Sequence, residues 1–232
     1  MLHLVFIIAY GIKYKYPQTL LFNLPNGVNM DKIMFAEVNF PLLDKVSATS
    51  EILAIPKKFS FWDDYRNTLM IPLMSKSEIS ASNNISGEFK WAAYAPKIIV
   101  DWFDEFVFPW MGMKSRVMAL ITQPNFHNYE HIDCDPHELN SRQHKFRIVL
   151  QGKTNTLYFI TDKGNISAPE IQGPFIMDGG WPHGMINDTN EIKVTLALGA
   201  PWTGNDKYDN INLLMDRSIY RMPDDLSSYW KK

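Results

Sequence analysis

The sequence predicts a mostly β protein in which flanking helices precede a sandwich or a barrel. A chain of 232 residues with 46% hydrophobic and 21% charged residues is long enough for one sizeable core. Its second half contains short β-rich runs, which Gly, Pro, Asn and Asp separate at near-regular intervals. Such a series is typical of a sandwich or barrel. The runs cover residues 116–122, 146–150, 155–161, 174–177 and 192–198.

The N-terminal residues do not resemble the rest of the chain. The apolar run 4–12 is too short to span a bilayer, and no basic segment precedes it. It is either a buried strand or part of a peripheral extension over residues 1–29. We favour the extension, with Met30 as the natural start and residues 30–232 as a single domain.

Two elements are predicted ahead of the β-rich runs. Residues 33–42 alternate as a strand does. Residues 96–108 place apolar side chains at helical spacing opposite acidic ones, so we expect an amphipathic helix that covers a sheet and that Pro109 ends.

Composition argues against some classes of partner. The net charge is −2, which favours neither a nucleic-acid nor an acidic-membrane surface, so no nucleic acid or membrane is expected as a partner. Cys134 is the single cysteine of the chain, so no internal disulfide can form, and we expect a cytoplasmic protein.

A candidate metal site appears within the β-rich half. Residues i and i+2 of a strand point to the same side, so His131 and Asp133 can bind one ion together. We expect this pair near the start of a strand. The third ligand would be His183, in the turn before the last β-rich run. Two His and one carboxylate on one face of a metal leave the other face open, as in non-haem Fe(II) oxygenases.

Basic residues on neighbouring runs suggest that an anion binds beside the metal. Lys193 follows His183 by ten residues and could hold the distal carboxylate of a small dicarboxylate, with Thr195 donating from the same face; the alternative is an exposed strand lysine. Arg147, in an apolar strand, is expected to meet an anion: the dicarboxylate, a substrate carboxylate or a structural Asp. Asp135 is a poorer candidate ligand than Asp133. Two further histidines, His137 and His144, are expected in a loop at the pocket rim.

With these motifs, the chain resembles the aspartyl/asparaginyl β-hydroxylase-like group of 2-oxoglutarate- and Fe(II)-dependent oxygenases, which includes free-proline hydroxylases. The resemblance covers residues 116–202, and more loosely 60–75. It rests on His131-x-Asp133, Phe146-Arg-Ile-Val-Leu-Gln-Gly152, Phe175-Ile-Met-Asp-Gly-Gly-Trp-Pro-His183-Gly-Met-Ile-Asn187 and Glu191-Ile-Lys-Val-Thr-Leu.

The resemblance implies a double-stranded β-helix (jelly-roll or cupin-like) with its core at about 116–202. It also implies Fe(II) on His131, Asp133 and His183, with 2-oxoglutarate and O2 as co-substrates. Two departures stand out. The 2-oxoglutarate anchor is usually Arg, here Lys193. The β-hydroxylases proper lack the carboxylate and usually carry a His where this chain has Val149, which places the chain nearer the amino-acid hydroxylases.

The implied activity is hydroxylation of an unactivated C–H bond in an amino acid or a peptide side chain. Arg66 and Trp181 are the candidate substrate contacts, and the expected partner is a small molecule or a peptide. The alternative is a non-catalytic barrel of cupin type that binds a metal or a small ligand. It predicts that Lys193 points away from the cleft between His131 and His183.

Overall fold

A computed structural model describes most of the β-rich half and the helices before it. The described residues are 4–9, 12–17, 34–64, 68–75, 89–133, 144–161, 164–199, 214 and 217–221. Within these ranges no helix has the length and apolar character needed to cross a membrane.

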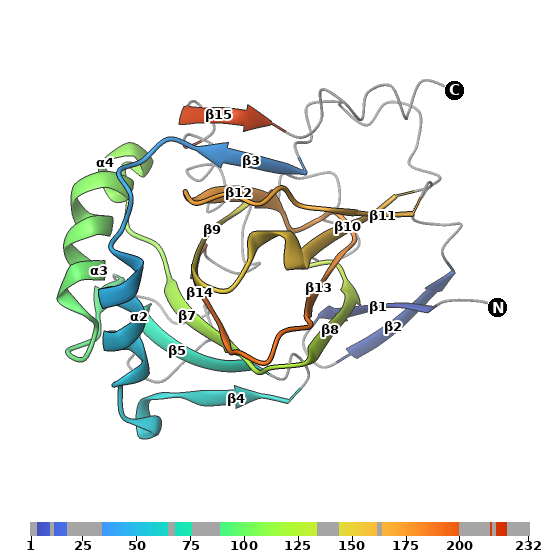
Figure 1. The fold of residues 1–232 in the computed structure, drawn as a ribbon, viewed down its shortest axis with the longest axis horizontal. Helices are drawn as coiled ribbons and strands as arrows, with labels where there is room; N and C mark the ends of the chain where they lie inside the picture. Colours follow the sequence, from blue (N-terminus) through green and yellow to red (C-terminus); the bar gives the residue numbers. More distant parts are fainter. Residues whose placement is uncertain are drawn as a thin grey trace.

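Two antiparallel sheets face each other across the interior (Figure 1). The larger sheet has the order β15-β3-β12-β9-β14-β7-β5-β4, with β6 paired to β5; the smaller one has the order β11-β10-β13-β8. The strands of the larger sheet are β3 (Phe35–Val38), β4 (Phe61–Asp63), β5 (Thr68–Ser75), β6 (Lys90–Trp91), β7 (Val117–Thr122), β9 (His144–Gln151), β12 (Phe175–Asp178), β14 (Lys193–Leu198) and β15 (Ser218–Arg221). Those of the smaller sheet are β8 (Phe126–His131), β10 (Leu157–Thr161), β11 (Gly164–Ser167) and β13 (His183–Asn187).

The strands β7 to β14 form a double-stranded β-helix. Four of them make the order β7-β14-β9-β12 in the larger sheet, and the other four make β8-β13-β10-β11 in the smaller one. Every pairing among them is antiparallel. The predicted fold is therefore confirmed, and its strands run from Val117 to Leu198, inside the predicted range 116–202.

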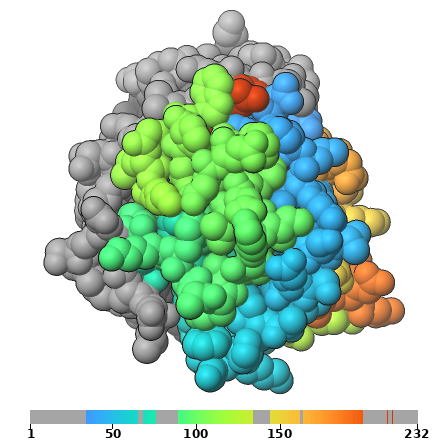
Figure 2. Space-filling model, turned by 90° about the vertical axis from the view of Figure 1, so that its left-hand side faces the viewer, coloured from blue at the N-terminus to red at the C-terminus, as the bar shows by residue number. Residues whose placement is uncertain are grey.

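Helices cover one side of the larger sheet. They are α2 (Lys45–Leu53), α3 (Lys97–Trp102), the π-helical turn η2 (Phe103–Val107) and α4 (Phe108–Met111). They lie together on the left in Figure 1, and the surface that they form faces the viewer in Figure 2. Their apolar side chains and those of the sheet form the main core, which includes Ile52, Ile99, Phe103 and Met111.

The amphipathic helix is present, but Pro109 does not end it. The helix continues to Met111 and stops at Gly112, which has a φ of 66°. A proline inside a helix normally removes a hydrogen bond and clashes with the carbonyl four residues earlier. Here the π-helical turn precedes it, so Pro109 falls in the first turn of α4, where a missing N–H costs little.

Two strands that carry the candidate metal ligands were not predicted. His131 is the last residue of β8 and His183 the first of β13, so the expected strand start and turn are both wrong. The sequence of β8 is polar and lacks clear alternation, and Gly184 in β13 suggested a turn. A side chain at Gly184 would collide with the Tyr158 hydroxyl on β10, so the glycine permits close strand pairing.

The N-terminal residues 4–17 contain a hairpin of β1 (Leu4–Ala9) and β2 (Ile12–Pro17), which pair with each other as a separate sheet. The division into an extension 1–29 and a domain 30–232 stays a prediction.

Candidate metal centre

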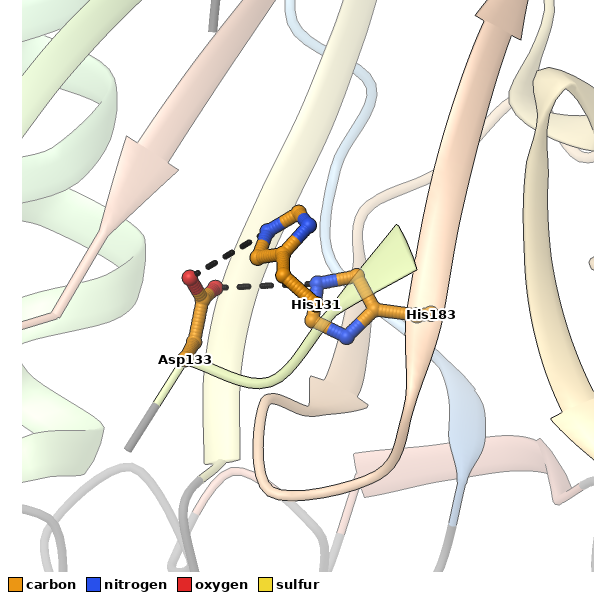
Figure 3. Close-up of side chains that lie close together, drawn as sticks. All are labelled: His131, Asp133 and His183. Atoms are coloured by element: carbon orange, nitrogen blue, oxygen red, sulfur yellow. Dashed lines mark ion pairs between the residues drawn. The ribbon is translucent and has the colours of Figure 1, made fainter. Parts of the chain in front are cut away.

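Three ligand-type side chains converge between the two sheets. His131 and His183 are paired neighbours on β8 and β13, and Asp133 lies two residues beyond the end of β8. Their ligand atoms all lie within 4.8 Å of one another, and all three residues are buried. The Nε2 atoms of His131 and His183 lie 3.5 and 3.7 Å from the Asp133 oxygens Oδ1 and Oδ2. Figure 3 shows the carboxylate facing both rings.

Backbone carbonyls fix the orientation of both imidazole rings. The Nδ1 atoms of His131 and His183 lie 2.7 Å from the carbonyl oxygens of Tyr129 and Trp181. A carbonyl only accepts, so each Nδ1 carries the proton and donates. Each Nε2 then presents its lone pair toward the centre of the site, which is the tautomer that a metal requires.

The protonation states also suit a cation. Burial, with His131 close by, lowers the pKa of His183 to about 3, so its ring is neutral at physiological pH. Burial would raise the pKa of Asp133, but the nearby Lys145 ammonium holds it well below its usual value. The site therefore offers a neutral His183 imidazole and an ionised Asp133 carboxylate, with the His131 imidazole beside them.

This donor set fits Fe(II). Imidazole and carboxylate ligands suit this metal, and three ligands on one side leave positions for other molecules. The Asp133 backbone N–H donates to the Gly179 carbonyl at 2.6 Å, which ties the end of β8 to the turn before β13. The turn itself is closed by Asp178, which accepts from the Gly180 N–H at 2.8 Å.

A cavity of about 110 Å³ adjoins the triad. Its lining includes all three candidate ligands and also Lys193 of β14. Lys193 is 3% exposed; its ammonium donates to the Lys153 carbonyl at 2.8 Å and to the Thr156 hydroxyl. Burial lowers the pKa of Lys193 to about 8, although Glu170 acts in the opposite direction. A buried ammonium beside a cavity is suited to pair with an anion there.

Thr195 and Arg147 line the same cavity. Thr195 lies two residues beyond Lys193 on β14, opposite Val149 of β9. Arg147 is half-buried; its Nη1 donates to the Phe146 carbonyl at 3.1 Å. The three predicted co-substrate contacts therefore share one cavity with the triad.

The candidate substrate residues are placed differently. Trp181 is not among the residues that line the cavity, and its indole N–H donates to the Ile160 carbonyl at 3.1 Å. Its ring packs against a second apolar cluster, which includes Phe35, Phe159 and Phe175. Arg66 lies outside the described residues, as do Asp135 and His137. A substrate contact by Arg66 or Trp181 stays a prediction. His144 is not in a loop at the rim, as expected, but is buried at the start of β9.

Sequence reasoning missed Lys145, whose Nζ lies 2.6 Å from Asp133 Oδ2. Lys145 shares the inward face of β9 with Arg147, and that alternation was the available signal. It also missed polar residues that line the cavity from strands β5, β7 and β8, namely Thr68, Thr122 and Asn128. Nothing in the local sequence separates these three from surface residues.

Fold and site together define a double-stranded β-helix with a two-histidine, one-carboxylate centre. No protein-family model matches the chain, and no curated protein matches its sequence. One similar solved structure is a Pseudomonas putida prolyl-4-hydroxylase, with 12% sequence identity and a TM-score of 0.47; the match covers 74% of this chain and 94% of that one. A second is a Trichoplax adhaerens prolyl hydroxylase in complex with a hypoxia-inducible-factor peptide, with 10% identity and a TM-score of 0.47; the match covers 73% of this chain and 84% of that one. A third is the viral collagen prolyl hydroxylase from Paramecium Bursaria Chlorella virus-1, with 14% identity and a TM-score of 0.41; the match covers 73% of this chain and 96% of that one. At such identities, neither membership of a family nor a function follows from the likeness.

Proposed function

We propose that this protein is an Fe(II)- and 2-oxoglutarate-dependent dioxygenase that hydroxylates an unactivated C–H bond of an amino acid or a peptide side chain. The observation that carries the proposal is one cavity whose lining combines a metal-type triad with a buried lysine. His131, Asp133 and His183 line this cavity, and so does Lys193.

The triad and the basic residues have separate tasks. The triad would hold the metal through the two Nε2 atoms and one carboxylate oxygen. Lys193 would pair with the distal carboxylate of 2-oxoglutarate, and Thr195 would donate a hydrogen bond to it. Arg147 adds positive charge to the same wall, which favours a dianion in the cavity.

Bound Fe(II) would activate O2, the oxidant: one oxygen atom would enter the C–H bond and the other would enter the succinate formed, with CO2, from 2-oxoglutarate. The chain's own contribution is to orient and to exclude water. The apolar side chains of Leu120, Val149 and Phe175 also line the cavity and limit the water that it holds.

The resemblance at sequence level also supports the finer assignment to the aspartyl/asparaginyl β-hydroxylase-like group, on its amino-acid hydroxylase branch. Asp133 completes the triad where the β-hydroxylases proper lack a carboxylate, and Val149 lines the cavity where they usually carry a His. A free amino acid is therefore the first substrate class to screen.

A non-catalytic cupin-type barrel is the alternative. It requires Lys193 to face away from the cleft between the histidines, because such a barrel has no use for a co-substrate anchor. Lys193 instead borders the same cavity as His131 and His183, and this favours the enzyme.

The test is an anaerobic titration of the protein with Fe(II) and 2-oxoglutarate, followed by visible absorption. A keto acid that chelates Fe(II) gives a weak metal-to-ligand charge-transfer band, which we expect for the wild type and not for His131→Ala. His127→Ala is the matched control, because His127 lies on the same strand but is exposed and bonds the Tyr158 hydroxyl. A wild-type protein that binds Fe(II) but gives no band with 2-oxoglutarate would favour the binding barrel.

A further inference from the structure

Lys145 contacts the candidate metal carboxylate directly. It is the second residue of β9, and its Nζ lies 2.6 Å from Asp133 Oδ2. Only 12% of the Lys145 side chain and 9% of the Asp133 side chain are exposed. A buried pair with this separation is a charge-assisted hydrogen bond, which is short and directional, unlike a surface ion pair.

The two carboxylate oxygens of Asp133 have different neighbours. Oδ1 faces His131 Nε2 at 3.5 Å. Oδ2 faces His183 Nε2 at 3.7 Å and also accepts from Lys145. The ammonium therefore occupies Oδ2, and Oδ1 faces the His131 ring.

We propose that Lys145 is a positioning residue for Asp133: it holds Oδ2, fixes the plane of the carboxylate and so presents Oδ1, on the side of His131, as the oxygen that a metal would take. The proposal rests on the metal site proposed above. It completes a pattern in the site, because each of the three ligands is then oriented by a separate partner: His131 by the Tyr129 carbonyl, His183 by the Trp181 carbonyl and Asp133 by Lys145.

Two effects of Lys145 on metal binding oppose each other. Its positive charge repels a cation, and its hydrogen bond fixes the ligand. Loss of an outer partner of a metal ligand typically lowers metal affinity by about 10- to 100-fold. Asp133 lies two residues beyond the end of β8; its backbone N–H bonds the Gly179 carbonyl, but the direction of its carboxylate depends on side-chain contacts such as that with Lys145. We therefore expect orientation to outweigh repulsion.

The test compares Lys145→Met with Lys145→Arg in full-length protein, using Co(II) alone as the metal probe. Methionine fills similar volume without a donor, and arginine restores both charge and donors. Affinity is measured by calorimetry, and the visible Co(II) spectrum at saturation reports the ligand geometry without any turnover. Lys114→Met is the control, since Lys114 forms an exposed ion pair with Asp104 at 3.0 Å on the helical side.

We expect Lys145→Met to lower Co(II) affinity by about 10- to 100-fold and to change the saturated spectrum, with Lys145→Arg within about threefold of the wild type. Lys114→Met should match the wild type. Lys145→Met that binds Co(II) as tightly as the wild type, with the same spectrum, would overturn the proposal. So would an equal loss in a well-folded Lys145→Arg, which would assign the effect to packing.

The two proposals fail in different ways. A wild-type protein that binds no Co(II) overturns the metal site and the role of Lys145 with it. If the wild-type protein binds Co(II) and gives the charge-transfer band with Fe(II) and 2-oxoglutarate, but Lys145→Met leaves Co(II) affinity and spectrum unchanged, only the role of Lys145 is overturned.

Discussion

The two faces of the same strands show opposite chemistry. On β14, Val194, Leu196 and Leu198 point into the core beneath the helices, whereas Lys193 and Thr195 line the cavity. The same division holds on β9 and β7. The core-facing residues there are Phe146, Ile148, Leu150, Val117, Ala119 and Ile121, and the cavity-facing ones are Arg147, Val149, Leu120 and Thr122.

We expect alternate residues of these strands to have different roles: the core-facing ones stabilise the fold, and the cavity-facing ones bind ligands. The helix-facing side is apolar and closely packed, so it supplies most of the hydrophobic stabilisation. The cavity-facing side keeps a lysine, an arginine and several threonines in buried or half-buried positions, where polar groups lower stability unless they are hydrogen-bonded, as Lys193 is. Substitutions on adjacent residues of one strand should therefore affect different properties.

The largest effect is expected from Phe146→Ala on the helix-facing side. Phe146 is fully buried and packs edge-on against Phe40 and Phe103, with ring centroids 6.1 and 6.2 Å away. Removing it should lower the free energy of unfolding by about 3–5 kcal/mol. Val149→Ala, on the cavity side of the same strand, should cost only about 1–2 kcal/mol. Urea denaturation of both variants measures the difference, and equal losses would contradict the division.

Lys193→Met should give the next largest effect, now on function. Losing the ammonium removes a charge-assisted hydrogen bond worth about 2–3 kcal/mol, so 2-oxoglutarate should bind at least ~30-fold more weakly. Metal binding should not change, because Lys193 does not contact the triad ligands in any described interaction. Calorimetry with Co(II), and then with 2-oxoglutarate added, separates the two. Unchanged 2-oxoglutarate affinity would mean that another residue is the anchor.

The same two faces explain which parts of the molecule could be predicted from the sequence. The runs that became β7, β9, β10, β12 and β14 are rich in apolar and β-branched residues, and this composition is local information. The strands β8 and β13 were missed because partner strands stabilise them: Asn128 and His131 are buried by pairing with β13, and Gly184 by packing against Tyr158. Tertiary contacts of this kind leave no local signal.

The candidate site divides in a similar way. His131, Asp133, His183, Lys193, Thr195 and Arg147 had recognisable spacing, and the structure places them around one cavity. Lys145 and the two carbonyls that orient the histidines did not. A carbonyl carries no sequence identity, and the contact between Lys145 and Asp133 joins elements that come together only in the folded sheet.

The cavity-facing Lys193 should also make the stability and the 2-oxoglutarate affinity depend on pH. Burial lowers the pKa of Lys193 from 10.5 to about 8, so the folded state releases this proton before the unfolded state does. Between these values the unfolded chain binds more protons, and the free energy of unfolding should rise with pH, by about 1–1.5 kcal/mol from pH 7 to 9. Lys193→Met should lack this rise, and subtracting its curve from that of the wild type removes the contributions of other groups.

Above pH 8 the affinity for 2-oxoglutarate should fall by up to ~10-fold per pH unit, because only the ammonium pairs with a carboxylate.

Thr195→Val is the smallest change on the cavity face and the most selective test of that face. Valine has the shape and the β-branching of threonine, so β14 should keep its pairing with β7 and β9 and the stability should stay within about 0.5 kcal/mol. Only the hydroxyl is lost. If Thr195 donates to the co-substrate carboxylate, 2-oxoglutarate should bind more weakly by about 1 kcal/mol, or ~5-fold.

Leu196→Val, at the next residue along β14, should show the reverse. A fully buried core side chain loses a methylene, which should lower the free energy of unfolding by about 1 kcal/mol without changing the 2-oxoglutarate affinity. If both substitutions changed both properties, the two faces of β14 would not be independent, and the separation of fold from site along this strand would not hold.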